Sequence, residues 1–333
     1  MHVLVTGAAG FIGSALCEQL IKAGNQVTAI DSFSKYYDVN LKLTRVNELL
    51  RPHSLDVINL DICDQIKIDQ LIKSRNPDVV INLAAQAGVR LSLENTNKYV
   101  ENNLVGFSNV LVSTVKNKVP LFLYASSSSI YGDKSKTPYS EKESNLHPTS
   151  FYGATKLANE WLTPTLVKNS STSARALRFF TVYGPWGRPD MAYFRMIANA
   201  ISGSEFNFYG DGSIERDFTY IQDAVNSVIA LMQELKSKPP GYSDVVNLGG
   251  GKPLSMNHLL ETVNSITNKK VFFNQFKTND NDVKKTMADS TYIQDLIGFK
   301  PSTSLSDGIS HTVNWAKNPE ISKQLDNWVK SVK

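Results

Sequence analysis

The sequence has 333 residues, 41% of them hydrophobic and 20% charged, which is the composition of an ordinary globular protein. Its net charge of +4 comes from 35 basic and 31 acidic residues without a long run of one sign, so we expect neither a nucleic-acid partner nor a membrane surface. Two cysteines cannot form a disulfide framework, and no apolar stretch reaches the ~18 residues that a membrane helix needs, so we expect a cytoplasmic protein.

Short apolar runs alternate with helical patterns in the first half of the chain. Strands are predicted at residues 2–6, 26–31, 55–60, 79–84 and 121–126, and helices at 11–24, near 40–50 and near 97–117. This alternation indicates a parallel sheet with helices on both faces. Beyond residue 180 the pattern gives way to segments rich in Gly, Pro and aromatic residues, which usually form binding loops.

A glycine turn directly follows the first predicted strand. Gly7, Gly10 and Gly13 lie in the segment TGAAGFIG, before the first helix. Glycine at these positions permits a tight turn, close approach of the backbone to a pyrophosphate, and close packing of helix on strand. Phe11 and Ile12 complete the turn, which predicts a dinucleotide site.

Asp31 ends the second predicted strand, where Rossmann folds place an acidic residue. A carboxylate there accepts hydrogen bonds from a ribose diol and repels a 2′-phosphate, so the predicted cofactor is NAD rather than NADP. We therefore expect a doubly wound α/β fold of the Rossmann type with a smaller α/β domain for the substrate. The NAD-binding domain is predicted at residues 1–178 plus about 217–248, and the substrate domain at about 179–216 plus 249–333.

Tyr152 and Lys156 are four residues apart in a predicted helix, so their side chains share one face. A phenol with a pKa near 10 is a poor base at neutral pH, and a neighbouring ammonium together with an oxidised nicotinamide would favour the phenolate. Tyr152 is then a candidate acid/base for a sugar hydroxyl while hydride passes to the cofactor.

No metal site is expected from the histidines. They are scattered without metal-ligand spacing, at His2, His53, His147, His258 and His311.

With these motifs, the chain resembles the extended short-chain dehydrogenase/reductases, which include NAD-dependent epimerases and dehydratases, over nearly its whole length. The resemblance implies a catalytic triad of Ser127, Tyr152 and Lys156. It also implies cofactor contacts from Asp61, Ile62, Leu83, Ala84, Ala85, Gln86 and Asn103. For Asn103, a solvent-exposed helix position without a role remains open.

Within this family, the segments AAQAGVR, YASSSSIYG and RFFTVYGPWGRPDM resemble UDP-glucuronate 4-epimerases. The resemblance implies conversion of UDP-glucuronate to UDP-galacturonate through a transient 4-keto sugar. Dehydratases and decarboxylases of the family carry an acidic residue just after the catalytic serine or threonine, because elimination or proton delivery to carbon needs an acid or base there. Here Ser128 and Ser129 follow Ser127, which favours an epimerase.

The same resemblance implies the substrate contacts. Arg188 is similar to the residue that holds the substrate carboxylate, and a planar guanidinium suits that role because it can bind a carboxylate bidentately. A surface arginine in a Pro-rich loop remains the alternative. Hydroxyl contacts are implied for Ser128, Ser129 and Thr181, diphosphate binding for Arg216, uracil contacts for Phe208 and Tyr209, and a ribose contact for Asp282.

Two positions depart from the family pattern. The usual Pro-Gly-Asp motif before the ribose contact reads Asp280, Asn281, Asp282 here. Pro164 lies in the helix that begins with Tyr152, and proline removes an internal hydrogen bond and kinks or ends a helix. Since the resemblance implies that this helix packs across a homodimer interface, Pro164 bears on the dimer.

Other functions remain open from the sequence. A UDP-glucose or UDP-N-acetylglucosamine 4-epimerase would share these motifs but would not need Arg188. A further alternative is a UDP-glucuronate decarboxylase. Another is a non-catalytic NAD-binding protein, although proteins that have lost catalysis typically lose the tyrosine or the lysine.

Overall fold

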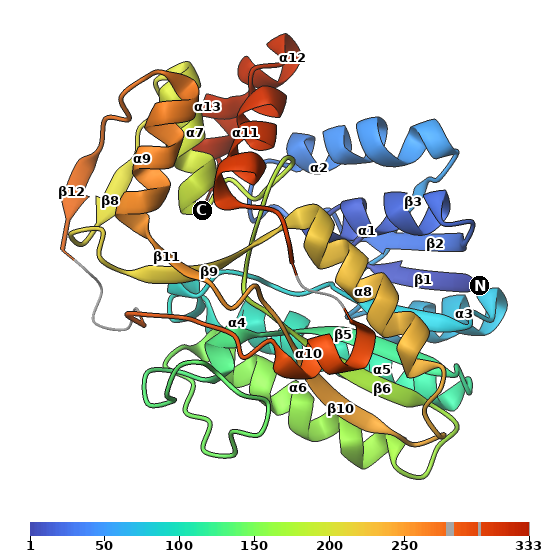
Figure 1. Ribbon diagram of the computed structural model, residues 1–333. Helices are drawn as coiled ribbons and strands as arrows, with labels where there is room; N and C mark the ends of the chain where they lie inside the picture. Colours follow the sequence, from blue (N-terminus) through green and yellow to red (C-terminus); the bar gives the residue numbers. More distant parts are fainter. Residues whose placement is uncertain (278–282, 299–300, 333) are drawn as a thin grey trace.

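The computed structural model describes residues 1–277, 283–298 and 301–332 (Figure 1). Asp282, expected to contact a ribose, therefore lies outside the described residues. Within these ranges no helix is both long and apolar enough to cross a membrane.

A parallel sheet forms the centre of the larger part of the molecule. Its seven strands within the described residues are β1 (His2–Thr6), β2 (Gln26–Asp31), β3 (Val57–Asn59), β4 (Val79–Asn82), β5 (Leu121–Ser127), β6 (Ser173–Phe179) and β10 (Ser243–Leu248). They lie in the order β10-β6-β5-β4-β1-β2-β3, and every neighbouring pair is parallel. The order reverses beside β1, as in Rossmann folds, and the predicted fold class is confirmed.

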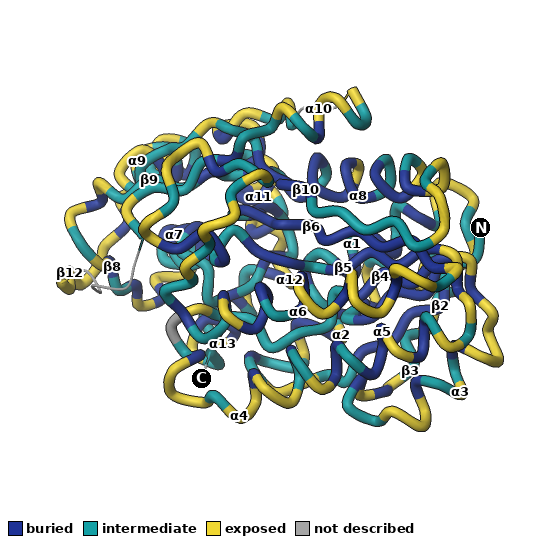
Figure 2. The backbone as a smooth tube through the Cα atoms, turned by 90° about the horizontal axis from the view of Figure 1, so that it is seen from below, coloured by how far each residue is buried: buried dark blue, intermediate teal, exposed yellow. Residues whose placement is uncertain are grey.

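Helices cover both faces of this sheet. They include α1 (Phe11–Lys22), α2 (Val39–Arg45), α3 (Gln65–Arg75), α5 (Phe107–Lys116), α6 (Phe151–Val167) and α8 (Ile221–Leu235). One apolar core joins the sheet to α1 and α8, and another joins it to α3 and α5. Figure 2 shows the central strands as buried and the outer sides of many helices as exposed. Burial on both faces explains why β4 has three consecutive apolar residues, Val79, Val80 and Ile81, rather than an alternating pattern.

Two predicted helices are interrupted. The one expected near 40–50 divides into α2 and a π-helical turn over Val46–Leu50. The one expected near 97–117 consists of α4 (Thr96–Tyr99), the π-helical segment η4 (Val100–Gly106) and α5. Side-chain periodicity cannot distinguish a π-helical turn from an α-helical one over so few residues.

The smaller part of the molecule lies at one end of the sheet (Figure 1). It contains the three-stranded sheet β11 (Pro253–Ser255), β9 (Glu215–Tyr220) and β7 (Thr181–Tyr183), and the pair β8 (Asn207–Tyr209) and β12 (Asn274–Phe276). Its helices are α7 (Ala192–Ser202), α9 (Met256–Thr267), α11 (Leu305–Ala316), α12 (Pro319–Ser322) and α13 (Leu325–Lys330), which share a separate apolar core.

Helix α10 (Thr291–Ile297) departs from the expected division of the chain. It packs on α8 and β10, and Ile293 belongs to the core of the larger part. Tyr292 also donates to Asp244 on β10. Residues 291–297 therefore lie with the parallel sheet, although the sequence pattern grouped them with the substrate domain.

Helix α6 continues through Pro164 and ends at Val167, one turn further on. The helix therefore does not end at Pro164, whose carbonyl still accepts a hydrogen bond from the Lys168 amide. Pro164 is exposed and has no N–H to donate to the carbonyl of Glu160, one turn earlier in the helix.

Candidate active site

A cavity of about 880 Å³ opens at the carboxyl ends of the parallel strands and extends beneath the smaller part of the molecule. Ligands of open α/β sheets bind at this edge. Most of the predicted site residues line the cavity: Gly7, Gly10, Phe11, Ile12, Gly13, Asp31, Ile62, Leu83, Ala84, Ala85, Gln86, Ser127, Ser128, Ser129, Tyr152, Lys156, Thr181, Arg188, Phe208, Tyr209 and Arg216.

The glycine turn is shaped as a cradle that a side chain would fill. Gly7 has a φ of +70°, which favours glycine, and a Cβ there would lie 2.8 Å from the amide nitrogen of Ala84. A Cβ on Gly13 would overlap the carbonyl oxygen of Gly7. Helix α1 begins directly after Gly10, so its first amides and its dipole point toward the cavity. The residues present therefore fit a dinucleotide pyrophosphate.

Asp31 lies at the end of β2 and is 7% exposed. Its two carboxylate oxygens accept hydrogen bonds from the amides of Ala9 (3.1 Å) and Phe33 (2.7 Å). Lys42 of α2 was not anticipated from the sequence. Its Nζ is 3.7 Å from Asp31 and 3.0 Å from Ser34 Oγ, and it lines the cavity. The carboxylate that repels a 2′-phosphate is thus partly balanced by an ammonium.

Asp61 and Asn103, both expected to contact the cofactor, are not among the residues that line the cavity. Asp61 is exposed, and its carboxylate accepts the Cys63 amide. Asn103 is 1% exposed, so it is not a solvent-facing helix residue; its side chain accepts from the Gln86 amide and donates to the Gln86 carbonyl and to Thr155 on α6. Asn103 acts on the cavity through Gln86.

Tyr152 and Lys156 lie in the first turns of α6, which Ser150 caps by accepting the Gly153 amide. Lys156 Nζ lies 5.7 Å from the centre of the Tyr152 ring and donates to the carbonyl of Ala125 on β5 at 2.9 Å. Ser127 ends the same strand. The structure therefore brings the three predicted catalytic residues together at one point of the cavity.

The protein surroundings of the Tyr152 phenol do not lower its pKa, although the sequence led us to expect that a neighbouring ammonium would favour the phenolate. Burial raises the pKa of Tyr152, while Arg188 and the Ser127 hydroxyl act in the opposite direction, and the pKa stays above its ordinary value. Burial also lowers the pKa of Lys156 to about 8. The protein by itself therefore keeps Tyr152 protonated at neutral pH.

Arg188 reaches the cavity from the loop after β7. Its Nε and Nη2 donate to the two carboxylate oxygens of Asp190 at 3.0 and 2.6 Å, and Tyr36 donates to Asp190 at 3.3 Å. Arg188 lines the same cavity as Ser127, Tyr152 and Lys156, and its charge acts to lower the pKa of the Tyr152 phenol. Asp190 was overlooked in the sequence, although it follows Arg188 by two positions and lines the cavity.

The remaining predicted substrate residues lie along the part of the cavity formed by the smaller domain. Thr181 begins β7, and Ser128 and Ser129 follow β5. Phe208 is buried, and Tyr209 packs on Phe276 with ring centres 5.5 Å apart. Nη1 of Arg216 donates to the carbonyl of Val283 at 2.7 Å, which places Arg216 beside the segment that leads away from Asp282.

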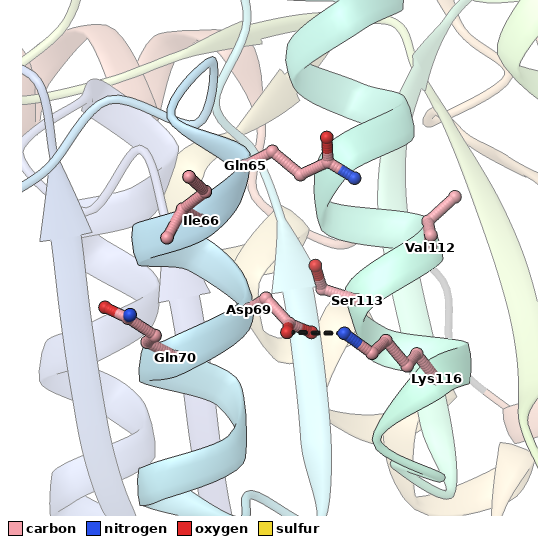
Figure 3. A pocket seen from close by; sticks show the side chains of 7 residues that line it. All are labelled: Gln65, Ile66, Asp69, Gln70, Val112, Ser113 and Lys116. Carbon is pink, nitrogen blue, oxygen red and sulfur yellow. Dashed lines mark hydrogen bonds and ion pairs between the residues drawn. The ribbon is translucent and has the colours of Figure 1, made fainter.

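A second, smaller hollow lies between α3 and α5 and contains none of the predicted site residues (Figure 3). Its charged groups bind each other, since Asp69 accepts from Lys116 at 2.7 Å and from Asn117 at 2.9 Å. Among the residues that the structure describes, no group of three or more His, Cys, Asp or Glu side chains is placed to hold a metal ion.

The fold and the site define a dinucleotide-binding α/β enzyme whose cavity contains Tyr152 and Lys156 side by side. Residues 3–249 match the model of the NAD dependent epimerase/dehydratase family, and the chain belongs to that family.

Individual relatives are similar over almost the whole chain. A probable UDP-glucuronate 4-epimerase of Rhizobium meliloti is 37% identical over 95% of this chain and 96% of its own length. The crystal structure of the UDP-glucuronic acid 4-epimerase of Bacillus cereus with UDP-glucuronic acid and NAD has a TM-score of 0.87 and 35% identity, covering 98% of this chain and 100% of that one. A UDP-glucose 4-epimerase of Thermotoga maritima with UDP-glucose has a TM-score of 0.85 and 28% identity, covering 95% and 98%.

Proposed function

We propose that this protein is an NAD-dependent UDP-glucuronate 4-epimerase, which interconverts UDP-glucuronate and UDP-galacturonate. The observation that supports this most directly is Arg188, a guanidinium inside the cavity whose charge acts on the phenol of Tyr152. In a hexuronate the carboxyl carbon is C6, which is attached to C5, the neighbour of C4. A cation close to the C4 acid/base therefore suits a sugar acid better than a neutral hexose.

The chain's residues divide the work of the reaction. Tyr152 takes the proton of the C4 hydroxyl and later returns it, and Ser127 supports the phenol. Lys156 lies beside the phenol ring and is anchored by its hydrogen bond to the Ala125 carbonyl on β5. NAD held at the glycine turn would supply the hydride acceptor and donor for C4. Ser128 and Ser129 follow Ser127 where a dehydratase or decarboxylase has an acidic residue, so these two positions supply no carboxyl group for elimination.

For the cofactor, we assign the pyrophosphate to the glycine turn of Gly7, Gly10 and Gly13, and the adenosine ribose to Asp31 with Lys42. The nicotinamide half is assigned to the segment 83–86 and to Tyr152 and Lys156, which line the same cavity. Residues 1–178 with about 217–248 form the proposed NAD-binding domain, to which α10 is added by its packing on α8.

For the substrate, we assign the carboxylate to Arg188, with hydroxyl contacts from Ser128, Ser129 and Thr181. Arg216 is assigned to the diphosphate, and Phe208 and Tyr209 to the uracil. The ribose contact of Asp282 remains a proposal from the sequence. A UDP-glucose 4-epimerase is the weaker alternative, because it gives Arg188 and its partner Asp190 no role.

A cytoplasmic homodimer is the proposed assembly. Apolar side chains are exposed along η4, α5 and α6, at Val105 (49%), Val112 (37%), Trp161 (67%), Leu162 (40%) and Leu166 (40%). Since α5 and α6 lie side by side, these side chains offer a surface for a second copy. Replacement of Trp161 by Glu is expected to give monomers in light scattering, and an unchanged dimer mass would place the interface elsewhere.

The experiment that tests the function is incubation of the purified protein with UDP-glucuronate, UDP-glucose and UDP-N-acetylglucosamine, with separation of the products by chromatography. Formation of UDP-galacturonate from UDP-glucuronate, and little turnover of the neutral sugars, is the expected result. Preferential epimerisation of UDP-glucose would overturn the proposal in favour of a hexose epimerase, and absence of any turnover by protein that holds NAD would point to a non-catalytic role.

A further inference from the structure

Arg45, the last residue of α2, is fully buried and does not line the cavity. Its guanidinium donates four hydrogen bonds: Nε to the carbonyl of Trp186 (2.8 Å), Nη2 to the carbonyl of Gly187 (2.9 Å), and Nη1 to the carbonyl of Ala9 (3.2 Å) and the hydroxyl of Tyr37 (2.6 Å). One side chain thereby joins the glycine turn to the residues immediately before Arg188.

Both ends of this connection lead to predicted ligand contacts. Ala9 lies between Gly7 and Gly10, and its amide donates to Asp31 while its carbonyl accepts from Arg45. Trp186 and Gly187 are the two residues before Arg188. The cofactor turn and the loop that carries the carboxylate-binding residue are therefore fixed to the same guanidinium.

The loop before Arg188 is in a conformation that needs such support. Trp186 has a φ of +63°, a left-handed conformation that non-glycine residues rarely adopt, and its ring packs on Trp315 at 5.1 Å. A side chain on Gly187 would overlap the Tyr193 hydroxyl. Residues in such conformations persist when the surrounding contacts determine them, and Arg45 holds both carbonyls of this turn.

The charge of Arg45 is also unusual for a residue with a purely structural role. Within the described residues it forms no ion pair, and its charge is solvated by three carbonyls and the hydroxyl and ring of Tyr37. Arg175, equally buried, pairs instead with Glu234 and Asp244. A buried cation without a carboxylate costs free energy of folding, so an apolar side chain would serve better if packing were its only task.

We propose that Arg45 is a positioning residue that fixes Arg188 relative to the NAD-binding turn, and so sets where the substrate carboxylate lies with respect to C4. This inference rests on the proposed function. Arg45 touches neither sugar nor cofactor, and its effect on the reaction passes through the backbone of Trp186 and Gly187. Without the Arg45 guanidinium, Arg188 should hold the substrate carboxylate less firmly, while the glycine turn still binds its cofactor.

The test replaces Arg45 with Lys, which keeps a cation but cannot reach all four acceptors, and compares it with Arg175→Lys as a matched buried control. The Arg45 variant is expected to raise KM for UDP-glucuronate about tenfold and to release a larger fraction of decarboxylated 4-keto-pentose per turnover. Its affinity for UDP, which has no carboxylate, should stay within about twofold of wild type. Arg175→Lys should lower Tm and leave these ratios unchanged.

Two further measurements keep the outcome decisive. If Arg45→Lys does not fold, Tyr37→Phe removes one acceptor of Arg45 and should shift the same ratios in the same direction by a smaller factor. Equal losses of affinity for UDP-glucuronate and UDP in calorimetry, or a fall in Tm without a change in KM or product ratio, would overturn the inference. Should the wild type fail to epimerise UDP-glucuronate, the proposed function falls, while the binding comparison still decides whether Arg45 acts on a carboxylate.

Discussion

Arg188 and Asp190 form a bidentate ion pair inside the cavity, through the Nε and Nη2 atoms of the guanidinium. Burial raises the pKa of Asp190, but Arg188 more than offsets this, so the carboxylate stays ionised. The expectation that Arg188 would present its fork to the substrate is thus modified, because one edge already binds a carboxylate of the protein. The other edge, formed by Nη1 and the second hydrogen of Nη2, is the one that a substrate carboxylate can bind.

Loss of Arg188 should remove carboxylate recognition. Once C4 of a glucuronate is oxidised, the carboxylate is β to a ketone and leaves as carbon dioxide when its bond aligns with the carbonyl. We expect Arg188→Ala to lose epimerisation of UDP-glucuronate by roughly 10²-fold and to release more UDP-4-keto-pentose and NADH per turnover, because the carboxylate is no longer held. Chromatography and mass spectrometry measure both products. Epimerisation equal to wild type would show that Arg188 is not the carboxylate ligand.

Asp190→Asn tests the contribution of the carboxylate to the ion pair between Arg188 and Asp190. The amide can still accept a hydrogen bond but carries no charge, so Arg188 gains freedom and KM for UDP-glucuronate is expected to rise by about tenfold. Tyr36→Phe, which removes only the hydroxyl that donates to Asp190, is the milder control. A KM that falls in Asp190→Asn would instead mean that Asp190 competes with the substrate for Arg188.

Removal of the phenol tests the chemical step. Tyr152→Phe is expected to retain the fold and bound cofactor while turnover falls by roughly 10²–10⁴, the loss typical of removing a general base. Since the pKa of Tyr152 lies above its ordinary value, the base form is scarce at neutral pH, and kcat/KM of the wild type should rise with pH. The residual activity of Tyr152→Phe should lose that rise. An unchanged pH profile would assign the ionisation to another group.

The parallel sheet could be predicted because its signals are local. The apolar β-branched runs, the glycine turn and the strand that ends in Asp31 are each contained in a segment of a few residues. The smaller part was predicted only as a region, since β8 pairs with β12 and β7 with β9 across long separations that no local pattern records. The position of α10 was not predicted for the same reason, because its contacts with α8 and β10 span long sequence separations.

The site residues that belong to a local sequence motif could be predicted. Those whose function depends on a tertiary contact could not. Asn103 and Arg45 bind residues that are distant in sequence, and Lys42 binds Asp31 from a different element. Asp190 had a local signal, an acidic residue two positions after Arg188, but an arginine in a loop does not reveal which of its edges is occupied. The geometry of side-chain pairs therefore had to come from the structure.

The cofactor preference is tested at Asp31. Asp31→Ser should weaken NAD binding and narrow the preference over NADP, because the carboxylate that repels a 2′-phosphate is gone and Lys42 remains beside the site. Lys42→Met in the same background should then reduce NADP binding again. Affinities from fluorescence titration with both cofactors measure this. Equal use of NAD and NADP by the wild type would show that Asp31 does not contact the ribose.

The last prediction concerns the buried charge of Lys156, which should lower the stability of the folded state. Burial lowers its pKa from 10.5 to about 8. Below pH 8 the lysine is charged in both the folded and the unfolded state, so the folded state carries the whole desolvation cost, about 3 kcal/mol by linkage. Between pH 8 and 10.5 the unfolded state binds more protons, so stability rises with pH through this group, and above 10.5 the cost is absent.

Lys156→Met should therefore abolish turnover yet raise Tm at pH 7. The hydrogen bond to the Ala125 carbonyl is lost, which subtracts about 1 kcal/mol, and a net gain of about 2 kcal/mol remains. The gap in Tm between variant and wild type, measured on protein freed of cofactor, should close as the pH is raised from 8 to 10.5. Lys168→Met, at an exposed position just beyond the same helix, is the control and should leave Tm within about 1 °C at every pH. A Met variant less stable than wild type at pH 7, or a gap that does not depend on pH, would mean that the ammonium of Lys156 is stabilised by its surroundings and that its charge carries no cost in the fold.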